Sequence, residues 1–358
     1  MAKNASGNDY FKQRDVVNKQ RLDAVIKNDL PSFCLQFFVA IENRTTMLTR
    51  LNYAYDLRVF FDYCIRNINR FSDYDVKKFG FGDMETVTAF EIECFLSYVS
   101  IYEKNEEVQK NGEKGKARKL ASIRALMNFL YKNDYISHNA AAKVQTPKIH
   151  EKEIVRLKGN EISDLLETVE TGTGMTRHQK AFHDKNKLRD TAIVTLLLGT
   201  GIRISECVGL NVDDVNFADN SFVVTRKGGN RVILYFSEEV AEALMPYLDY
   251  RVSDESADKN QKALFLSKSK ERLSTRSIEL LVRKYSQLSV PLKRITPHKL
   301  RSTYGTELYR ETGDIYVVAD VLGHRDVNTT KKHYAAITDD IRKKASDKVR
   351  LHKSKTEE

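Results

Sequence analysis

Apolar residues recur at intervals of three and four along most of this chain, and this spacing is the feature that most restricts the possible folds. It gives each segment one apolar stripe, so most elements must be amphipathic helices that pack through a single face. Four such stripes follow one another in the first half of the chain, at residues 33–41, 53–65, 92–99 and 123–130. They predict a small helical bundle.

The pattern changes to alternation in the middle of the second half. Residues 221–225 and 231–236 are rich in β-branched and aromatic side chains, and Gly228-Gly229 lies between them. Two such runs around a Gly-Gly turn predict an antiparallel β-hairpin. Helical spacing returns after the hairpin. The predicted fold class is therefore mainly α: an N-terminal helical bundle and a C-terminal α-rich domain with a small antiparallel hairpin.

A chain of 358 residues is long for one compact domain, because domains usually run about 100 to 200 residues. The stretch from Val144 to Lys152 is polar, lacks a period and contains Pro147, which predicts an extended linker. We therefore expect a charged N-terminal segment that buries little, a helical domain, the linker, an α-rich domain and a charged C-terminal helix with a tail. Their ranges are 1–30, 31–146, 147–154, 155–336 and 337–358.

The sequence predicts a soluble, intracellular protein. Its longest apolar run, residues 192–198, is far shorter than the roughly 20 residues of a membrane helix. The first ten residues are polar and do not resemble a secretory signal. The four cysteines stand far apart without a CxxC pair, which indicates buried thiols in the cytosol and neither a disulfide framework nor a zinc site.

Positive charge is concentrated in two tracts. The chain carries a net charge of +10, whereas residues 110–148 and 251–300 each carry +7. Two separated basic tracts indicate a polyanion such as DNA held from two sides, and solvated helix faces are the alternative. The candidate DNA contacts are Lys114, Lys116, Arg118, Lys119, Arg124, Lys148, Lys293, Arg294 and Lys299.

An HxxR motif follows a strong helix start. Thr296 is a good N-cap residue and Pro297 fits the first helical turn, where a missing N–H has no cost. His298 and Arg301 then share one face near the positive end of the helix dipole, which favours an anion. A chance HxxR on a surface helix is the alternative interpretation.

A second group surrounds Arg203, which follows the turn Gly199-Thr200-Gly201 at the end of an apolar helix. An arginine between two isoleucines is half-buried and needs an anionic partner. That partner is either Glu206 or another carboxylate of the protein, or a bound phosphate. The turn lacks the GK[ST] sequence of a P-loop, so nucleotide binding is disfavoured.

Two further groups are weaker when taken alone. Lys227 stands at the tip of the predicted hairpin, where it either delivers a proton or keeps the turn solvated. Gly323 places His324 at a helix end, and Tyr334 follows ten residues later beside basic residues, where an exposed tyrosine is often only a stacking or packing group.

These residues occur in a distinctive order: Arg203, Lys227, His298, Arg301, His324 and Tyr334. The order resembles the tyrosine recombinase (phage integrase) family, whose catalytic domain presents an arginine after a turn, a hairpin lysine, HxxR, a histidine or tryptophan, and a nucleophilic tyrosine. The likeness covers residues 155–340 and extends weakly to 30–145, where the family places a helical core-binding domain. A two-domain Xer-like enzyme or a compact mobile-element integrase is the nearer match.

The resemblance implies a reaction in which Tyr334 attacks the scissile phosphate, forms a 3′-phosphotyrosyl link and releases a 5′-hydroxyl. It implies that Lys227 donates a proton to the leaving oxygen. No ATP is needed because the covalent link conserves the bond energy. No cofactor is expected, and the sequence contains no cluster of acidic residues of the kind that holds a catalytic metal.

The other site residues receive their roles from the same resemblance. Arg203 and Arg301 would hold the non-bridging phosphate oxygens, and His298 and His324 would hydrogen-bond the phosphate. His298 would also assist the removal of the proton from the tyrosine. Glu206 matches the acidic residue that the family places after its first arginine, and would orient the site.

The chain departs from the family pattern in two places. Most members carry the tyrosine one residue nearer to the histidine, where this chain has His333. Tyr334 remains the expected nucleophile, because Tyr304, Tyr309 and Tyr316 precede the histidine. In addition, Ser302-Thr303-Tyr304 replaces the usual His-Thr-Phe, although hydroxyls can also bind phosphate.

The resemblance also implies partners: double-stranded DNA with inverted half-sites, four protomers on two duplexes, and accessory proteins in some systems. The expected location is the cytoplasm, in association with the nucleoid and with no membrane. The C-terminal helix either docks on a neighbouring protomer or is a solvated end. Two rival functions remain at this stage: a catalytically silent DNA-binding relative, and a monomeric type IB topoisomerase-like enzyme.

Overall fold

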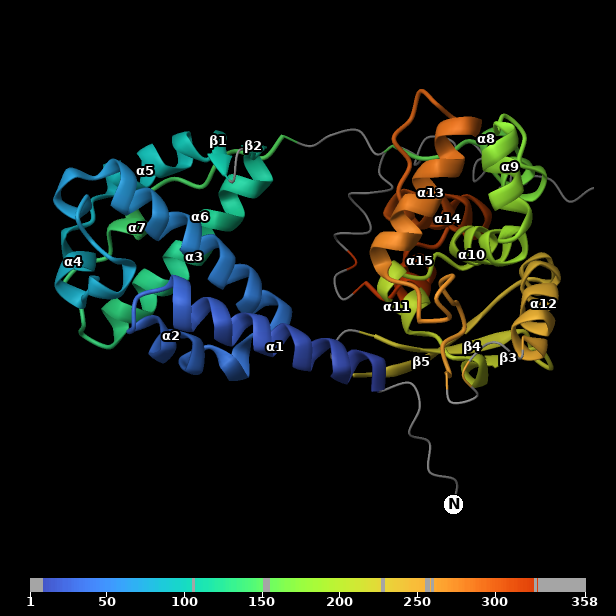
Figure 1. Cartoon of the computed structure of the whole chain (residues 1–358), viewed down its shortest axis with the longest axis horizontal. Coiled ribbons are helices and arrows are strands. Elements are labelled where there is room, and N and C mark those ends of the chain that lie inside the picture. The colour runs from blue at the N-terminus through green and yellow to red at the C-terminus, as the bar shows by residue number, and fades with distance from the viewer. Residues whose placement is uncertain are drawn as a thin grey trace, which may run out of the picture. The chain divides into compact units, whose positions relative to one another are not determined.

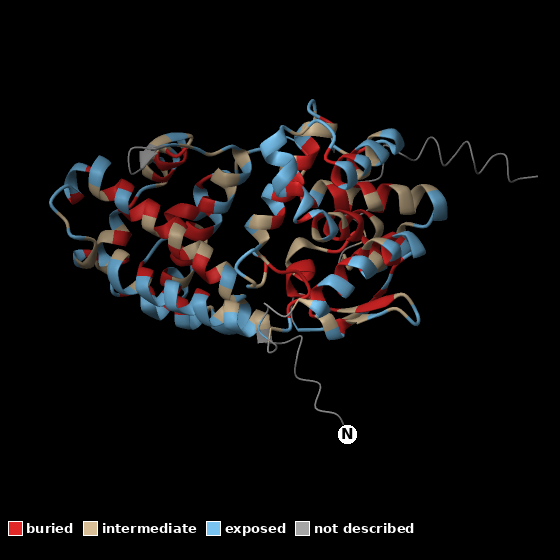
Figure 2. Ribbon diagram, turned by 45° about the vertical axis from the view of Figure 1, so that its right-hand side comes forward, coloured by how far each residue is buried: buried red, intermediate tan, exposed pale blue. Residues whose placement is uncertain are grey.

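The structure, a computed structural model, describes residues 9–104, 107–150, 155–226, 229–254, 258, 261–324 and 327. The chain divides into two compact units (Figure 1), one spanning Phe11–Lys152 and the other comprising Met1–Tyr10 and Glu153–Glu358. Each unit has a core of its own, which Figure 2 shows as buried residues in red inside exposed ones in blue.

The first part of the chain is helical apart from one hairpin. Its elements are α1 (Asp9–Asp29), α2 (Cys34–Ala40), η1 (Glu42–Arg44), α3 (Met47–Asn67), η2 (Asn69–Phe71), η3 (Val76–Lys78), α4 (Phe81–Thr86), α5 (Ala89–Tyr98), β1 (Ile101–Lys104), β2 (Glu107–Lys110), α6 (Glu113–Lys132) and α7 (Ala140–Lys143). The four predicted stripes fall in or beside α2, α3, α5 and α6, and most of their apolar residues are buried. The predicted bundle is confirmed.

Two features of this unit differ from expectation. The N-terminal segment forms α1, and Leu22 and Val25 of this helix are buried in the core, although we expected residues 1–30 to bury little. The hairpin β1–β2 was not predicted, because its alternation is short: Tyr102 packs against the core, whereas Ile101 and Val108 are exposed.

The larger unit contains all the remaining elements. They are α8 (Gly159–Thr171), α9 (Arg177–Asp184), α10 (Lys187–Thr200), α11 (Ile204–Gly209), η4 (Val212–Asp214), β3 (Val215–Asn216), β4 (Ser221–Thr225), β5 (Arg231–Tyr235), α12 (Glu238–Ser253), α13 (Thr275–Ser289), α14 (Pro297–Thr312) and α15 (Ile315–Leu322). The predicted hairpin is confirmed as β4–β5, and β3 adds a short third strand to form a sheet with the order β3-β4-β5.

Helix α10 is the centre of this unit. It packs against α8, α12 and α14 (Figure 1), and it is buried on nearly all sides, with Ala192, Leu196 and Leu197 inaccessible to solvent. A helix that is apolar all round belongs in the interior of a domain. The C-terminal end of α10 therefore delivers the glycine turn at residues 199–201 to a fixed place between neighbouring helices.

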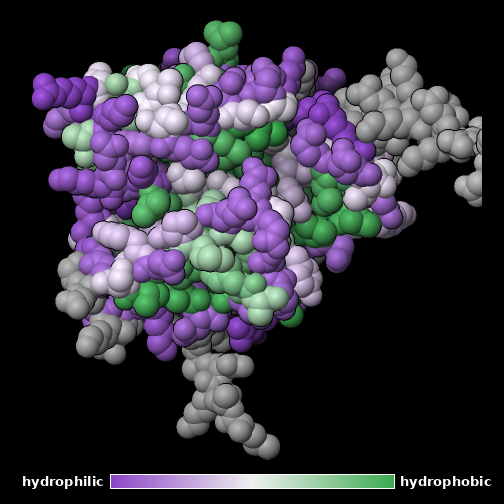
Figure 3. All heavy atoms as spheres, turned by 90° about the vertical axis from the view of Figure 1, so that its right-hand side faces the viewer, coloured by the Kyte–Doolittle hydropathy of each residue, from purple (hydrophilic) through white to green (hydrophobic). Residues whose placement is uncertain are grey.

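Figure 3 shows one face of the molecule, on which hydrophobic residues in green form separate patches among hydrophilic residues in purple. Within the described part of the chain, no helix combines the length and apolar character needed to cross a membrane. Three of the four cysteines are buried as free thiols, as predicted: Cys34, Cys64 and Cys207.

Arg70 and Glu91 join η2 to the start of α5. Two nitrogens of the Arg70 guanidinium donate to the two carboxylate oxygens of Glu91, at 2.5 and 2.8 Å. Glu91 also accepts the backbone N–H of Thr88 at 2.9 Å and so completes the capping box of the helix. These hydrogen bonds, those from Arg70 above all, lower the pKa of Glu91 to about 2.

We expect Glu91→Gln to lower the free energy of unfolding by about 1.5 to 3 kcal/mol near neutral pH, because a hydrogen bond to a charged group is lost. A carboxylate with a depressed pKa stabilises the fold above its ordinary pKa of 4.5 and loses that effect as the pH falls toward about 2. The difference between variant and wild type should therefore shrink steadily below pH 4.5. Urea unfolding followed by circular dichroism at several pH values measures this difference.

Glu93→Gln is the matched control, because Glu93 is exposed on the same helix and makes no ion pair within the described chain. It should change the unfolding midpoint little at any pH. A Glu91→Gln difference that stayed constant between neutral and acidic pH would contradict the assignment of the ion pair.

Candidate active site

The C-terminal turn of α15 is the centre of the candidate site. Gly323 ends the helix in the left-handed conformation, with φ of 62°. Its N–H donates to the carbonyl of Asp320, and the N–H of His324 donates to the carbonyl of Ala319, both at 2.8 Å. This is the Schellman arrangement, which satisfies two of the carbonyls that a helix end leaves over. The next three carbonyls along the chain take no part in it.

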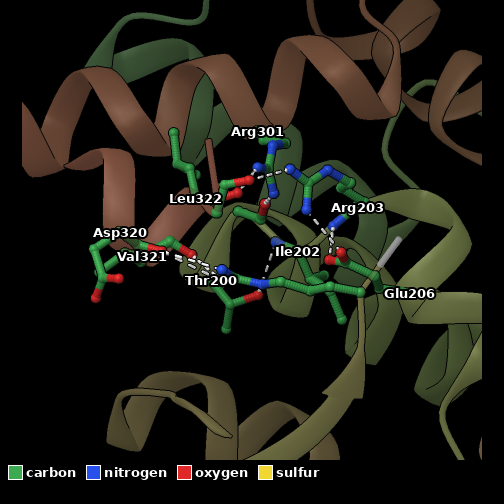
Figure 4. Close-up of polar contacts among 11 residues, drawn as sticks. Thr200, Ile202, Arg203, Glu206, Arg301, Asp320, Val321 and Leu322 are labelled. Carbon is green, nitrogen blue, oxygen red and sulfur yellow. Dashed lines mark hydrogen bonds and ion pairs between the residues drawn. The ribbon is translucent and has the colours of Figure 1, made fainter. Parts of the chain in front are cut away.

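Each of those three carbonyls accepts a hydrogen bond from a different arginine. Arg226 Nη2 donates to Val321 at 2.9 Å, Arg301 Nη2 donates to Leu322, and Arg203 Nη2 donates to Gly323 at 2.7 Å. Figure 4 shows Arg203 and Arg301 approaching the turn that contains Val321 and Leu322. The arginines come from the end of β4, from α14 and from the start of α11. The negative end of a helix dipole favours such a gathering of cations.

Arg203 is oriented by Glu206. Arg203 occupies the N-cap position of α11, and its backbone N–H donates to Glu206 Oε2 at 3.0 Å. Its Nη1 donates to Glu206 Oε1 at 2.8 Å, and this carboxylate is only 4% exposed. The same carboxylate therefore fixes both ends of the arginine. About a third of the Arg203 side chain remains exposed, which leaves it accessible to an anion.

Arg301 is buried and is held by backbone carbonyls of two other elements. It lies in the second turn of α14, which begins at Pro297 after the N-cap Thr296, as predicted. Its Nη1 donates to the carbonyl of Gly201, in addition to the bond from Nη2 to Leu322. Gly201 has φ of 60°, and a Cβ there would lie 2.5 Å from the Tyr304 ring. A glycine is therefore required where the end of α10 meets α14.

Of the two predicted histidines, His298 lies on the helix that carries Arg301, and His324 follows the turn that accepts the arginine hydrogen bonds. His298 is exposed in the first turn of α14, one turn before Arg301. His324 directly follows Gly323 and is partly buried, with its backbone tied to α15. The structure thus brings Arg203, Arg301 and the histidine-bearing turn together.

The hydroxyls that follow the HxxR motif bond to backbone. Ser302 donates to the carbonyl of His298 at 3.0 Å. Thr303 is buried, donates to the carbonyl of Lys299 and accepts the N–H of Leu157, each at 3.0 Å. This second bond ties the segment before α8 to α14. Our expectation that these hydroxyls could bind phosphate therefore does not apply to Thr303, whose oxygen is already engaged.

Other tyrosines of the region have ordinary packing roles or are exposed. Tyr304 packs against Val318 and Leu322, and burial raises the pKa of its hydroxyl. Tyr316 is 70% exposed on α15. Lys227, Tyr334 and the expected C-terminal helix at 337–358 lie outside the described residues.

Four of the nine candidate DNA contacts are engaged within the protein. Lys119 is buried and bonds to Asp56 at 3.1 Å, so the prediction that it contacts DNA is wrong. Arg118 bonds to the same carboxylate. Arg124 donates to the carbonyls of Ala141 and Val144, and Lys293 donates to Glu161 at 2.6 Å.

The other five candidates make no side-chain hydrogen bond or ion pair to any described residue: Lys114, Lys116, Lys148, Arg294 and Lys299. Lys114, Lys148 and Arg294 are exposed, and the other two are partly exposed.

Arg226 is not among the site residues predicted from the sequence. The turn that contains it was recognised, and a cation directly before the hairpin lysine was a visible signal, but its partners are backbone carbonyls 94 and 95 residues away. Nothing in the local sequence points to such distant carbonyls. Across the described residues, no group of three or more His, Cys, Asp or Glu side chains is placed to hold a metal ion.

Comparison with known proteins agrees with this geometry. Residues 155–340 match the model of the phage integrase family. The chain is 31% identical over 306 residues to the tyrosine recombinase XerC of Caldanaerobacter subterraneus subsp. tengcongensis, covering 83% of this chain and 80% of that protein. It is 30% identical over 351 residues to the tyrosine recombinase XerS of Streptococcus thermophilus, covering 90% and 96%.

Solved structures show the same fold. The XerH site-specific recombinase, bound to a palindromic difH substrate, superposes with a TM-score of 0.63 at 18% identity, over 85% of this chain and 80% of that one. An integrase of the transposon Tn1549 in complex with DNA gives a TM-score of 0.61 at 18% identity, over 86% and 98%. Given the arginine cluster, the family match and the full-length relatives, the chain belongs to the phage integrase family and is a tyrosine recombinase.

Proposed function

We propose that this protein cleaves and rejoins DNA at specific sites through a 3′-phosphotyrosyl intermediate, with Tyr334 as the nucleophile and without metal or ATP. The observation that carries the proposal is the pair of guanidinium groups, Arg203 and Arg301, held on one backbone turn. Family membership supports site-specific recombination.

The arginine pair suits the chemistry of a phosphodiester. Negative charge grows on the equatorial oxygens in the transition state, and fixed cations stabilise that charge without reorganising during the reaction. A guanidinium presents a planar fork that can hold two oxygens of one phosphate. Because Glu206 and the α15 turn fix Arg203 and Arg301 in advance, little entropy is lost when the phosphate arrives.

The remaining residues complete the reaction. Tyrosine has a pKa of about 10 in water, and neighbouring cations favour the phenolate. His298 assists the removal of that proton and, with His324, hydrogen-bonds the phosphate. Lys227 protonates the leaving 5′-oxygen. Reversal of the same steps rejoins the strand, because the phosphotyrosyl link keeps the energy of the broken bond.

DNA is the proposed substrate, and both parts of the chain contact it. XerH and the Tn1549 integrase were solved with DNA, which supports the same partner here. We propose that residues 31–146 form a core-binding domain, that 155–336 form the catalytic domain, and that the linker at 147–154 lets them grip the duplex from two sides. The exposed cations Lys114, Lys148 and Arg294 are the best candidates for phosphate contacts.

The proposed assembly is a homotetramer on two duplexes with inverted half-sites, located in the cytoplasm with the nucleoid. The segment 337–358 would dock on a neighbouring protomer. Light scattering of the protein with and without its DNA site measures the assembly. Footprinting on genomic DNA identifies the site and comes first.

Tyr334→Phe should abolish covalent attachment to DNA, because the attacking oxygen is removed. The assay uses a duplex that carries the footprinted site with a nick beside the cleavage position, so that the cleaved strand diffuses away and the adduct accumulates. Denaturing electrophoresis should show a protein–DNA adduct with the wild type and none with the variant.

His333→Phe is the matched control, because it changes the neighbouring residue and leaves the tyrosine intact. It should retain the adduct. An adduct that survived Tyr334→Phe would refute the nucleophile, and a wild type that formed no adduct would favour the silent DNA-binding relative. Relaxation of supercoiled DNA without exchange between two duplexes would favour the topoisomerase-like alternative.

Arg301→Lys should slow adduct formation by roughly 100- to 1,000-fold, since one preorganised donor to the phosphate is lost. The single-turnover rate at saturating DNA measures this effect. Arg310→Lys is the control, because Arg310 lies on the same helix and pairs with Glu307 at 2.7 Å. Equal rates for the two variants would contradict the role of Arg301.

Lys227→Ala should slow cleavage of ordinary DNA by roughly 100- to 10,000-fold, because the leaving 5′-oxygen loses its proton donor. A substrate with sulfur in place of that oxygen needs no such donor, since a thiol has a pKa of only about 8.5. Lys227→Ala should therefore cleave the sulfur substrate as fast as the wild type does. A defect that persisted on the sulfur substrate would show that Lys227 has another role.

A further inference from the structure

Arg226 is fixed at both its backbone and its side chain. Its N–H donates to the carbonyl of Asn230 at 2.8 Å, and its own carbonyl accepts the N–H of Gly229 at 3.0 Å, which closes the turn of the β4–β5 hairpin. Its guanidinium donates to Val321 at 2.9 Å and, through both Nη atoms, to Asp320 at 3.3 and 3.4 Å. One residue thus connects the end of β4 to the end of α15.

The guanidinium of Arg226 is committed to this contact. Its Nε atom is buried and has no hydrogen-bond partner among the described residues. A Cβ on Gly323 would lie 2.2 Å from Arg226 Nη1, so the arginine packs directly on the glycine that ends the helix. Both Nη atoms of Arg226 donate to backbone carbonyls of α15. On this side of the guanidinium, protein atoms take the place of water.

Arg226 donates to the carbonyl of Val321, which directly precedes the two carbonyls that accept from Arg301 and Arg203. The carbonyls of Val321, Leu322 and Gly323 are consecutive, so a change at the first alters the direction of the other two. Without Arg226, Val321 and Asp320 lose their side-chain donor, and the turn keeps only its internal hydrogen bonds and those from Arg203 and Arg301. Helix ends without such partners tend to fray.

We propose that Arg226 is a positioning residue: by fixing the last turn of α15, it sets the direction in which Arg203 and Arg301 present their guanidinium groups. This inference rests on the proposed function, in which that pair holds the scissile phosphate. Arg226 itself does not touch the phosphate. Its contribution is geometric, and a misplacement of about 1 Å at a reacting centre can slow a reaction by about 100-fold.

The test compares Arg226→Gln with Arg231→Gln. Arg231 lies on β5 of the same hairpin and makes a long ion pair with Asp214, at 3.7 Å, so both variants lose one charge from one hairpin. We expect Arg226→Gln to slow adduct formation at saturating DNA by about 10- to 100-fold. The DNA dissociation constant and the final amount of adduct should stay at wild-type values, and Arg231→Gln should match the wild type throughout.

The final amount of adduct distinguishes a defect in positioning from a defect in folding. A variant that only misfolded would reduce the fraction of active protein, and so the final amount, without changing the rate of the active fraction. An Arg226→Gln variant that lost amount and kept the rate would overturn the proposal. So would a variant whose main defect was weaker DNA binding.

A double variant asks whether Arg226 acts through the arginine pair. If it does, Arg226→Gln should reduce the rate of adduct formation by a smaller factor in the Arg301→Lys background than in the wild type, because one of the two positioned groups is already altered. A double variant whose rate reduction equalled the product of the two single reductions would overturn the proposal.

The sulfur substrate tests the alternative that Arg226 acts by positioning the neighbouring Lys227. It should leave the Arg226→Gln defect unchanged, and full rescue would show that Arg226 acts through the proton donor instead. The two proposals fail in different ways. No adduct with the wild type refutes the proposed function, whereas equal rates for the wild type and Arg226→Gln refute this inference alone.

Discussion

Hydrogen bonds from three arginines to three consecutive backbone carbonyls hold the functional part of this protein together. The carbonyls are those that remain when α15 ends in a Schellman turn, and the arginines come from β4, α11 and α14. β4, α11 and α14 are separated from one another in the chain by other elements, so the turn supplies a common point to which each is attached. A carbonyl left unbonded in a protein interior has a large desolvation cost, and a guanidinium without an acceptor has a larger one. Each carbonyl therefore supplies the acceptor that a guanidinium needs, and each guanidinium supplies the donor that a carbonyl needs.

The apolar core makes that arrangement possible. Helix α10 is buried on nearly all sides and ends at Gly201, whose carbonyl accepts from Arg301 and whose missing side chain admits the Tyr304 ring. Two residues later Arg203 starts α11, already oriented by Glu206. A rigid helix thus determines where a polar site can form at its end. The proposed chemistry needs such rigidity, because electrostatic stabilisation works best when the donors do not have to move.

The sequence allowed the fold class, the hairpin and the start of α14 to be predicted, because each depends on local pattern: helical spacing, a Gly-Gly turn, and threonine before proline. It could not show which cations are free. Lys119 is buried because Asp56 lies beside it in the fold, although the two are 63 residues apart in the chain. Arg226 was missed for the same reason. A charge count treats every lysine and arginine alike, whereas burial and distant partners divide them into structural and exposed groups.

The bond between Leu157 and Thr303 has a mechanical consequence. The backbone of the segment that leaves the linker is fastened to a buried hydroxyl on α14, two residues beyond Arg301. Leu157 also lies in the hydrophobic core of this unit, and the carbonyl of Arg156, the residue before it, accepts a hydrogen bond from Lys293 at 3.0 Å. The residues at which the chain enters the larger unit are therefore fixed both to its core and to the helix that carries Arg301.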